Sequence, residues 1–261
     1  MGLRFLMNYY LIRVAYDGTA YSGWQIQPNA VSVCGILQER FAKVFGVPCT
    51  IVGASRTDAG VHAYDQVARV STTLALSPAH MLRAWGNRLP SDIVIRVITE
   101  TDASFHPQYH VAYKEYWYHL FCVRPLPFLS RFGTALPEYV HSFDVPLFTR
   151  TLQLFEGEHD FTSFARIEEG YNPVRTVDSI RVEELKRYNA IRVVVRGEGF
   201  LRYQIRRMVG AAVMVARDGA AVSYDDICSL LKTPQRTSPA FFNIDAQGLC
   251  LRKIVYKKDL V

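Results

Sequence analysis

The segment Arg56-Thr57-Asp58-Ala59-Gly60-Val61-His62 places one carboxylate between small residues directly after a predicted strand. A loop of this kind leaves room for a substrate beside Asp58. The Arg56 guanidinium, two residues away, can hold that carboxylate ionised, as a nucleophile or general base requires, or it can bind an RNA phosphate. The simpler interpretation is a hairpin connection, in which Asp58 bonds its own backbone, Gly60 takes positive φ and Arg56 forms a surface ion pair.

A second segment, residues 197–210, is a glycine-rich strand end that leads into a predicted helix. Arg202 and Arg206 are four residues apart, which puts them on one face of that helix, while apolar residues occupy another face. Because a helix N-terminus also favours anions, this element can bind a phosphate or present Arg206 to a catalytic carboxylate. The alternative is an ordinary amphipathic helix with solvated arginines.

A third segment, residues 114–121, is rich in aromatic side chains. Strand alternation sends Tyr116, Tyr118 and Leu120 to one face and Trp117 with its alternate neighbours to the other. Aromatic residues on a sheet usually belong to the core, but a ring at the mouth of a cleft can stack on an extruded base. Composition leaves both interpretations open.

The elements that must position these side chains follow from hydrophobic periodicity. It predicts strands over residues 9–16, 50–54, 61–70, 93–98, 113–123, 176–184, 190–196 and 249–256, and helices over 32–45, 77–85, 145–155, 201–216 and 224–231. Residues 124–144 contain three prolines and are expected to form a surface excursion. Because strands and helices are mixed without regular alternation, we expect two α+β lobes. Residues 1–105 would carry the Asp58 loop, and residues 106–261 the aromatic strand and the arginine helix.

Composition narrows the class of protein. With 261 residues, 49% of them hydrophobic and 21% charged, the chain has the balance of a globular protein rather than a disordered one. Its formal charge of +6 favours a polyanionic partner such as nucleic acid. Five cysteines without a C-x-x-C pair indicate a reducing compartment. We find no membrane-length apolar run and no signal peptide, so we expect a cytoplasmic protein without membrane contact.

Metal and cofactor motifs are missing from the sequence. His106 and His110 are four residues apart, but Pro107 between them argues against the helix that would direct both to one ion. His62 is better interpreted as a structural hydrogen-bond donor than as a base. There is no P-loop and no dinucleotide fingerprint. We therefore expect neither a metal nor any other cofactor.

Taken together and in this order, these segments resemble the TruA family of tRNA pseudouridine synthases. The resemblance spans nearly the whole chain, and the string from Arg56 to His62 is its most specific part. The other matching segments are Tyr16-Asp17-Gly18-Thr19-Ala20-Tyr21-Ser22-Gly23-Trp24-Gln25, Tyr116-x-Tyr118, Asp160-Phe161-Thr162-Ser163-Phe164, Pro173-Val174-Arg175, Gly199-Phe200-Leu201-Arg202, Arg206-Arg207-Met208-Val209-Gly210 and Gly248-Leu249.

The resemblance implies a fold and an activity. The fold is a homodimer of two-lobed α+β subunits, in which a largely antiparallel sheet with helices on one side joins the lobes and a basic catalytic cleft lies between them. The implied partner is the anticodon stem-loop of tRNA. The implied reaction isomerises uridine to pseudouridine at positions 38 to 40 and needs no cofactor.

The resemblance also implies roles for residues. Asp58 is the catalytic carboxylate, Arg56 and Arg206 are its charged neighbours in the substrate site, and Tyr116 stacks against the target base. The residues implied to contact RNA beyond that base are Arg202 and Arg207. Asp58 would add to the base, attack the sugar or remove a sugar proton, and the sequence does not choose among these.

Three segments depart from the family pattern, and one of them, residues 239–244, stands where the family commonly has a short proline-rich lead into Gly-Leu. Gln108 stands where the family usually has an arginine, which puts the choice of target uridine in doubt. Lys114-Glu115 replaces a basic pair and removes one positive charge from the expected RNA face. Two alternatives stay open: a sister enzyme that modifies other uridines, and a noncatalytic RNA-binding module that binds tRNA without forming pseudouridine.

Overall fold

The computed structural model describes residues 7–109, 111–136, 142–217, 220–236 and 243–257. The chain folds into two compact units. The first unit consists of the residues up to Ala112 together with those from Leu251 onward, and the second consists of Tyr113–Cys250. Within the described residues, no helix is long and apolar enough to cross a membrane.

The first unit is built on a sheet with the strand order β4-β1-β3-β11, and β2 pairs with β3. The strands are β1 (Asn8–Tyr16), β2 (Cys49–Gly53), β3 (His62–Thr72), β4 (Ile93–Thr101) and β11 (Leu249–Tyr256). Strand β1 runs antiparallel to both β3 and β4, and its alternate residues Ile12, Val14 and Tyr16 are buried. The apolar alternation of the sequence therefore turns one face of β1 to the core.

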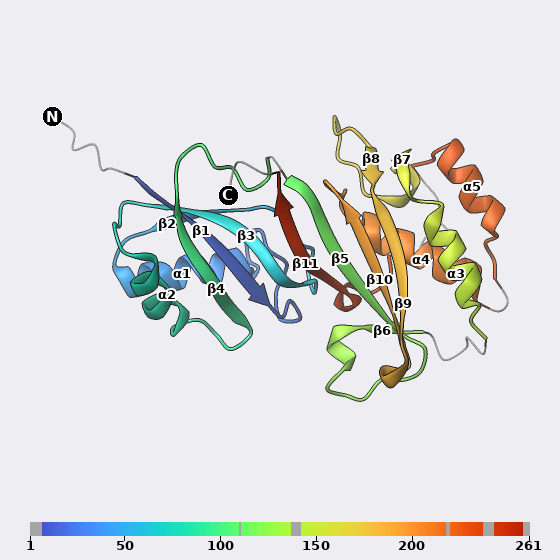
Figure 1. Ribbon diagram of the computed structural model, residues 1–261, viewed down its shortest axis with the longest axis horizontal. Helices are drawn as coiled ribbons and strands as arrows, with labels where there is room; N and C mark the ends of the chain where they lie inside the picture. Colours follow the sequence, from blue (N-terminus) through green and yellow to red (C-terminus); the bar gives the residue numbers. More distant parts are fainter. Residues whose placement is uncertain (1–6, 110, 137–141, 218–219, 237–242, 258–261) are drawn as a thin grey trace. The chain divides into compact units, whose positions relative to one another are not determined.

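Two helices, α1 (Val33–Phe45) and α2 (Pro78–Gly86), lie on the same side of this sheet (Figure 1). The Ser32 hydroxyl caps α1 by accepting a hydrogen bond from the backbone N–H of Gly35, as expected for an N-cap serine. The helices pack on each other through Phe41 and Trp85, whose ring centroids are 5.0 Å apart. This core lies beneath the strands that carry the Asp58 loop.

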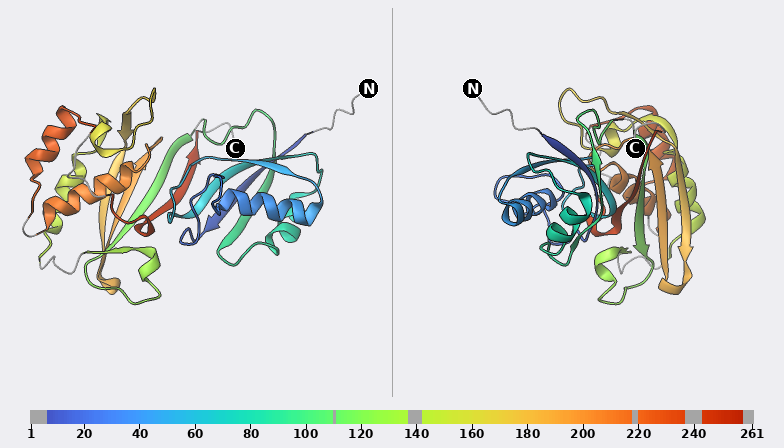
Figure 2. Two further views of the ribbon diagram at one scale, coloured as in Figure 1. Left: turned by 180° about the vertical axis from the view of Figure 1, so that it is seen from behind. Right: turned by 60° about the vertical axis from the view of Figure 1, so that its left-hand side comes forward.

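The second unit has its own strands and helices. Its strands β5 (Val111–Phe121), β10 (Ala190–Gly197) and β9 (Ser179–Leu185) pair in that order, antiparallel throughout, and β6 (Thr134–Ala135) adds to β5. A separate hairpin-like pair consists of β7 (Gly157–Asp160) and β8 (Val174–Val177). Helices α3 (Val145–Gln153), α4 (Gln204–Ala216) and α5 (Tyr224–Lys232) lie on one side of the three long strands (Figure 2). The short 3-10 helices are Ser130–Phe132, Thr162–Phe164, Lys186–Tyr188 and Ala246–Gly248.

The predicted α+β class is confirmed, with differences in some elements. The predicted strand over 176–184 is two strands, β8 and β9, which are separated at Asp178. The Asp178 N–H donates to the Arg196 carbonyl, and β8 pairs with β7. Strand β7 was not predicted. Helix α4 begins at Gln204 rather than at residue 201, because Tyr203 takes a left-handed conformation with φ of 65°. The predicted excursion over 124–144 contains a 3-10 helix and β6, and its residues 137–141 lie outside the described residues.

Candidate active site

Asp58 and Arg56 lie together on the loop that joins β2 to β3 in the first unit. Asp58 is half-buried, whereas Arg56 is exposed. The N–H of Val61 donates to the Asp58 carbonyl at 3.2 Å, and Gly60 has a φ of 78°. The expected tight turn with a left-handed glycine is therefore present, and it directly follows the predicted catalytic carboxylate.

The segment that follows β1 supports this loop. The N–H of Trp24 donates to the Thr57 carbonyl at 3.1 Å, and the Tyr16 hydroxyl lies 2.7 Å from the Thr57 hydroxyl. Gly23 has a φ of 93°, and a Cβ atom there would lie 2.5 Å from the Thr57 carbonyl oxygen. Only glycine lets the two loops approach this closely. The motif from Tyr16 to Gln25 thus fixes the backbone on which Asp58 sits.

Two glutamines hold the residues just before the loop. The buried amide of Gln66 accepts from the Ser55 N–H at 3.2 Å and donates to the Ser55 carbonyl at 2.7 Å. The Gln108 amide donates to the Gly53 carbonyl at 3.1 Å. Gln108 occupies the position where an arginine was expected, and in this chain it holds the end of β2. Sequence reasoning missed Gln66, whose only signal is a polar residue in an otherwise buried strand.

His62 ends the loop as a structural residue. It is 5% exposed, and its Nδ1 accepts a hydrogen bond from the Gly18 N–H at 3.1 Å. Gly18 packs so closely that a Cβ atom would lie 2.0 Å from the Val61 carbonyl oxygen. The same Nδ1 also lies 3.1 Å from the Asp17 carboxylate, so the ring contacts the segment after β1 and has a structural place in the fold.

Tyr116 lies on β5 in the second unit, opposite Val195 of β10. It is 6% exposed and meets Phe200 edge-on, with ring centroids 5.4 Å apart. Tyr118 on the same face is fully buried, as strand alternation predicts. Tyr116 is therefore held by packing on its own unit rather than standing exposed.

The three predicted arginines of the second unit gather around the Tyr203 ring. The guanidinium carbons of Arg202, Arg206 and Arg207 lie 4.9, 5.4 and 5.9 Å from its centroid. We call these three residues the arginine cluster. Because α4 begins at Gln204, Arg202 precedes the helix, so the expectation that it shares a helical face with Arg206 is wrong. The left-handed Tyr203 brings them together instead.

Arg206 and Arg207 are shielded from solvent, whereas Arg202 is exposed, as the alternative of solvated arginines expects. Arg206 is 9% exposed, and its Nε donates to the Ile244 carbonyl at 2.7 Å. Arg207 donates to the Ala165 carbonyl at 2.7 Å. Burial lowers the pKa of Arg207, the Tyr203 hydroxyl opposes this, and the nearby guanidinium groups lower it further. An arginine nevertheless keeps its charge, so the cluster presents positive charge at fixed positions.

Two further charged residues lie near Tyr116. Burial lowers the pKa of Lys114 from 10.5 to about 8, against the opposing effect of the Glu198 carboxylate. Glu115 is buried and accepts hydrogen bonds from Arg196 at 2.6 Å and from the Trp117 indole at 3.0 Å. The acidic residue that departs from the family pattern is thus neutralised by an arginine within its own sheet.

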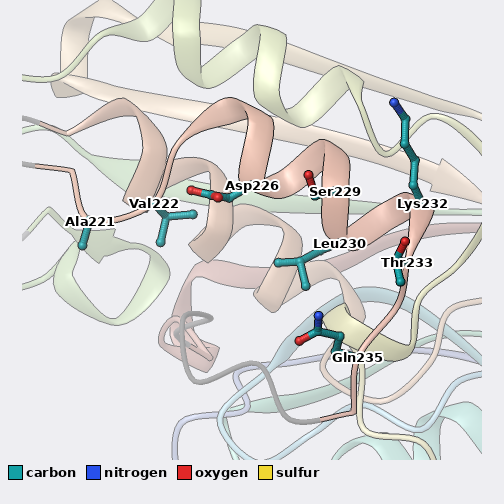
Figure 3. Close-up of a pocket in the computed structure, with 8 residues that line it drawn as sticks. All are labelled: Ala221, Val222, Asp226, Ser229, Leu230, Lys232, Thr233 and Gln235. Atoms are coloured by element: carbon teal, nitrogen blue, oxygen red, sulfur yellow. The ribbon is translucent and has the colours of Figure 1, made fainter.

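The hollow drawn in Figure 3 contains none of the predicted site residues. It has a volume of about 540 Å³ and is formed by α5 and the segments that flank it. Its acidic residue, Asp226, caps α5 by accepting hydrogen bonds from Ser223. Within the described ranges, no group of three or more His, Cys, Asp or Glu side chains is arranged to hold a metal ion.

The family model and the similar curated proteins indicate the same family. The family model described as tRNA pseudouridine synthase matches residues 12–110 and 151–257. The tRNA pseudouridine synthase A of Chlamydia felis is 31% identical, over 97% of this chain and 93% of that protein. The proteins of the same name from Chlamydia pneumoniae and Exiguobacterium sibiricum are each 35% identical, over 93% and 97% of this chain and 90% and 98% of their own lengths.

Among solved structures, an H/ACA RNP bound to a substrate RNA containing 2′-deoxyuridine matches with a TM-score of 0.36 and 14% identity. That match covers 78% of this chain and 44% of the other. The family membership rests on the sequence matches, which extend through both units of the fold. The chain therefore belongs to the family of tRNA pseudouridine synthases, which are isomerases.

Proposed function

We propose that this protein isomerises uridine to pseudouridine in the anticodon stem-loop of tRNA, at positions 38 to 40, with Asp58 as the catalytic carboxylate. Membership of the tRNA pseudouridine synthase family supports the reaction class. The observation that carries the role of Asp58 is its loop, which is bonded to the segment after β1 on one side and lies between two strand ends. A carboxylate on so fixed a backbone meets the geometric demand of catalysis.

The reaction breaks the bond between uracil N1 and C1′ of the ribose, turns the base, and joins its C5 to the same C1′. A proton then leaves C5, and one is gained at N1, so the reaction is redox-neutral. The base must leave the helical stack and stay bound while it is detached. Asp58 would act by adding to the base, by attacking C1′ or by removing a sugar proton.

The other predicted residues have supporting roles in this proposal. Arg56, on the same loop, binds the nucleotide or a phosphate beside Asp58. Tyr116 stacks on the target base, and Arg206 supplies the positive charge that keeps a catalytic carboxylate ionised. Arg202 and Arg207 bind RNA phosphates, which suits guanidinium groups held by backbone carbonyls and an aromatic ring.

The direct test is Asp58→Asn, which keeps the size and removes the charge. We expect the variant to form no pseudouridine in tRNA transcripts, as detected by base-specific chemical mapping, and to bind those transcripts with unchanged affinity. Retained product formation would remove Asp58 from the mechanism. If the wild-type protein itself binds tRNA but forms no pseudouridine, the noncatalytic RNA-binding module is the correct alternative.

Mapping pseudouridine across total RNA with and without the protein tests the positions. New pseudouridine at 38 to 40 supports the proposed target, whereas products elsewhere identify a sister enzyme with other uridine targets. We also propose that the protein is a homodimer. Light scattering after size-exclusion chromatography is expected to give twice the chain mass of 29.7 kDa, and the monomer mass would contradict this.

A further inference from the structure

Two arginine side chains contact the ring of an exposed tyrosine in the first unit. Tyr64 lies near the start of β3 and is 47% exposed. The guanidinium carbon of Arg96, from β4, lies 4.4 Å from the ring centroid, and that of Arg252, from β11, lies 4.0 Å from it. Three strands of one sheet thus bring two cations to a single aromatic surface. We call these three residues the Tyr64 clamp.

A buried carboxylate orients one side of the Tyr64 clamp. Arg96 Nη1 donates to the Tyr64 carbonyl at 3.1 Å and to Asp65 Oδ1 at 3.3 Å. The other oxygen of Asp65 accepts a hydrogen bond from Arg13. The Asp65 side chain is only 9% exposed. Arg96 is therefore held in one orientation at the surface by contacts to β3, and its position is fixed before any ligand arrives.

The chemistry of the Tyr64 clamp suits a phosphodiester. A guanidinium that lies over a ring contacts it through its flat face, whereas phosphates are bound through the N–H edge, so the two interactions are compatible. Asp65 contacts both Arg13 and Arg96, so one carboxylate offsets only part of the positive charge that these strands gather, and a polyanion is attracted to the remainder. Arginine is also the side chain that binds phosphate in a bidentate manner.

The Tyr64 clamp lies close to the Asp58 loop along the fold. Ala63, the residue before Tyr64, pairs with Tyr16 at the end of β1, and the Tyr16 hydroxyl lies 2.7 Å from the Thr57 hydroxyl. Tyr16 also pairs with Ile93 at the start of β4, the strand that carries Arg96. The Tyr64 clamp and the proposed catalytic loop therefore share one end of the first unit's sheet.

From this placement we infer that Arg96 and Arg252 bind phosphates of the substrate RNA on the flank of the target uridine, with Tyr64 holding the two guanidinium groups in register. This inference rests on the proposed function for the identity of the RNA. It assigns to the first unit a phosphate-binding surface that is separate from the arginine cluster and from Arg56.

The test measures the salt dependence of tRNA binding. Arg96→Gln, Arg252→Gln and the double variant are compared with the wild-type protein in fluorescence anisotropy with a labelled tRNA transcript, between 50 and 300 mM KCl. We expect each single variant to weaken binding severalfold at low salt and to reduce the slope of log K against log salt by about 0.9, and the double variant by about twice that. The matched control is Arg83→Gln, which removes an exposed charge from α2 and is expected to keep the wild-type slope.

A second set of variants guards against misfolding. Arg96→Lys keeps the charge and is expected to keep most of the slope. Thermal melting of every variant checks that the fold is retained. Wild-type slopes in both arginine-to-glutamine variants would overturn the inference, and so would a change in only one of them, because the proposed surface uses both.

The outcome is separable from that of the proposed function. Binding and its salt slope are measured without any product, so a protein that forms no pseudouridine can still lose slope in the variants, which would support the phosphate surface and reject the enzyme. Conversely, wild-type slopes together with full pseudouridine formation in Arg96→Gln and Arg252→Gln would reject the surface and leave the enzyme intact.

Discussion

At the scale of single residues, short polar contacts hold the loop that carries Asp58. Gln66 holds Ser55 through both atoms of its amide, and the Tyr16 hydroxyl contacts Thr57. Gln108 adds a contact to the Gly53 carbonyl. Each of these side chains contacts the backbone or a side chain of the loop region, so they are positioning residues in the proposed mechanism.

Gln108 tests this positioning role with little risk to the fold. Gln108→Leu removes the amide that bonds Gly53, and because Gln108 is exposed, we expect the free energy of unfolding to fall by less than about 1 kcal/mol. Pseudouridine formation is expected to slow roughly three- to tenfold, since small displacements of a catalytic group are costly. Single-turnover rates on tRNA transcripts measure this, and a wild-type rate would show that the contact to Gly53 has no positioning role.

The lowered pKa of Lys114 predicts that the free energy of unfolding depends on pH. Its pKa is lowered from 10.5 to about 8 by burial, so between these values the unfolded state binds more protons than the folded state. The free energy of unfolding contributed by this residue therefore rises with pH through that window. Between pH 7.5 and 10, the free energy of unfolding of the wild type is expected to rise by roughly 1 to 2 kcal/mol more than that of Lys114→Met. This value is reduced because the side chain is partly exposed. Urea unfolding at both pH values measures it, and parallel profiles would contradict it.

At the scale of elements, most strands and helices follow directly from the sequence. Ser32 and Gly46 mark both ends of α1, and alternation places Tyr116 and Tyr118 on the buried face of β5. The start of α4 could not be predicted in this way, because the left-handed conformation of Tyr203 is rare for an aromatic residue and depends on its surroundings. The surroundings of Arg206 could not be predicted either, since the Ile244 carbonyl lies 38 residues away in sequence.

The close packing of two loops gives an element-scale prediction. Gly23→Ala would place a Cβ atom 2.5 Å from the Thr57 carbonyl oxygen in a backbone with φ of 93°, so the Asp58 loop must move. We expect a loss of roughly 2 to 4 kcal/mol in unfolding free energy and a fall of at least tenfold in the rate of pseudouridine formation.

The matched control for that prediction is Gly46→Ala. Gly46 also has a left-handed φ, of 70°, but an added Cβ atom would meet nothing within 4 Å. It should cost only the backbone strain, about 1 kcal/mol, and leave the rate unchanged. Thermal melts and single-turnover assays compare the two variants, and equal rates in both would mean that the approach of Gly23 to Thr57 is not needed for catalysis.

At the scale of the whole molecule, the proposed site residues are divided between the units, with Asp58 and Arg56 in the first and Tyr116 and Arg206 in the second. The chain returns to the first unit at its end, where β11 pairs with β3. Nothing in the local pattern of residues 249–256 predicts that partner, because strand pairing over such a sequence separation depends on the completed core.

Strand β11 is also linked to the Asp58 loop through a series of contacts. The Tyr256 hydroxyl donates to the Pro107 carbonyl at 2.7 Å, and its ring packs edge-on against Phe105 at 5.4 Å. Gln108, which follows Pro107, donates a hydrogen bond to the Gly53 carbonyl at the end of β2. The last described strand therefore supports the segment that holds the start of the Asp58 loop.

Truncation of the chain tests this long-range support. Removing residues 251–261 takes away the buried side chains of Leu251, Ile254 and Tyr256, and at about 1.5 to 3 kcal/mol each their loss is comparable to the whole stability of a domain. We expect the first unit to unfold, with rapid proteolysis around residues 54–61 and no pseudouridine formation. A control on the same strand is Lys253→Ala, which removes an exposed side chain and should melt and react like the wild type. If the deletion kept the wild-type melting temperature and activity, the first unit would hold the Asp58 loop without β11, and the proposed path from Tyr256 through Gln108 would be wrong.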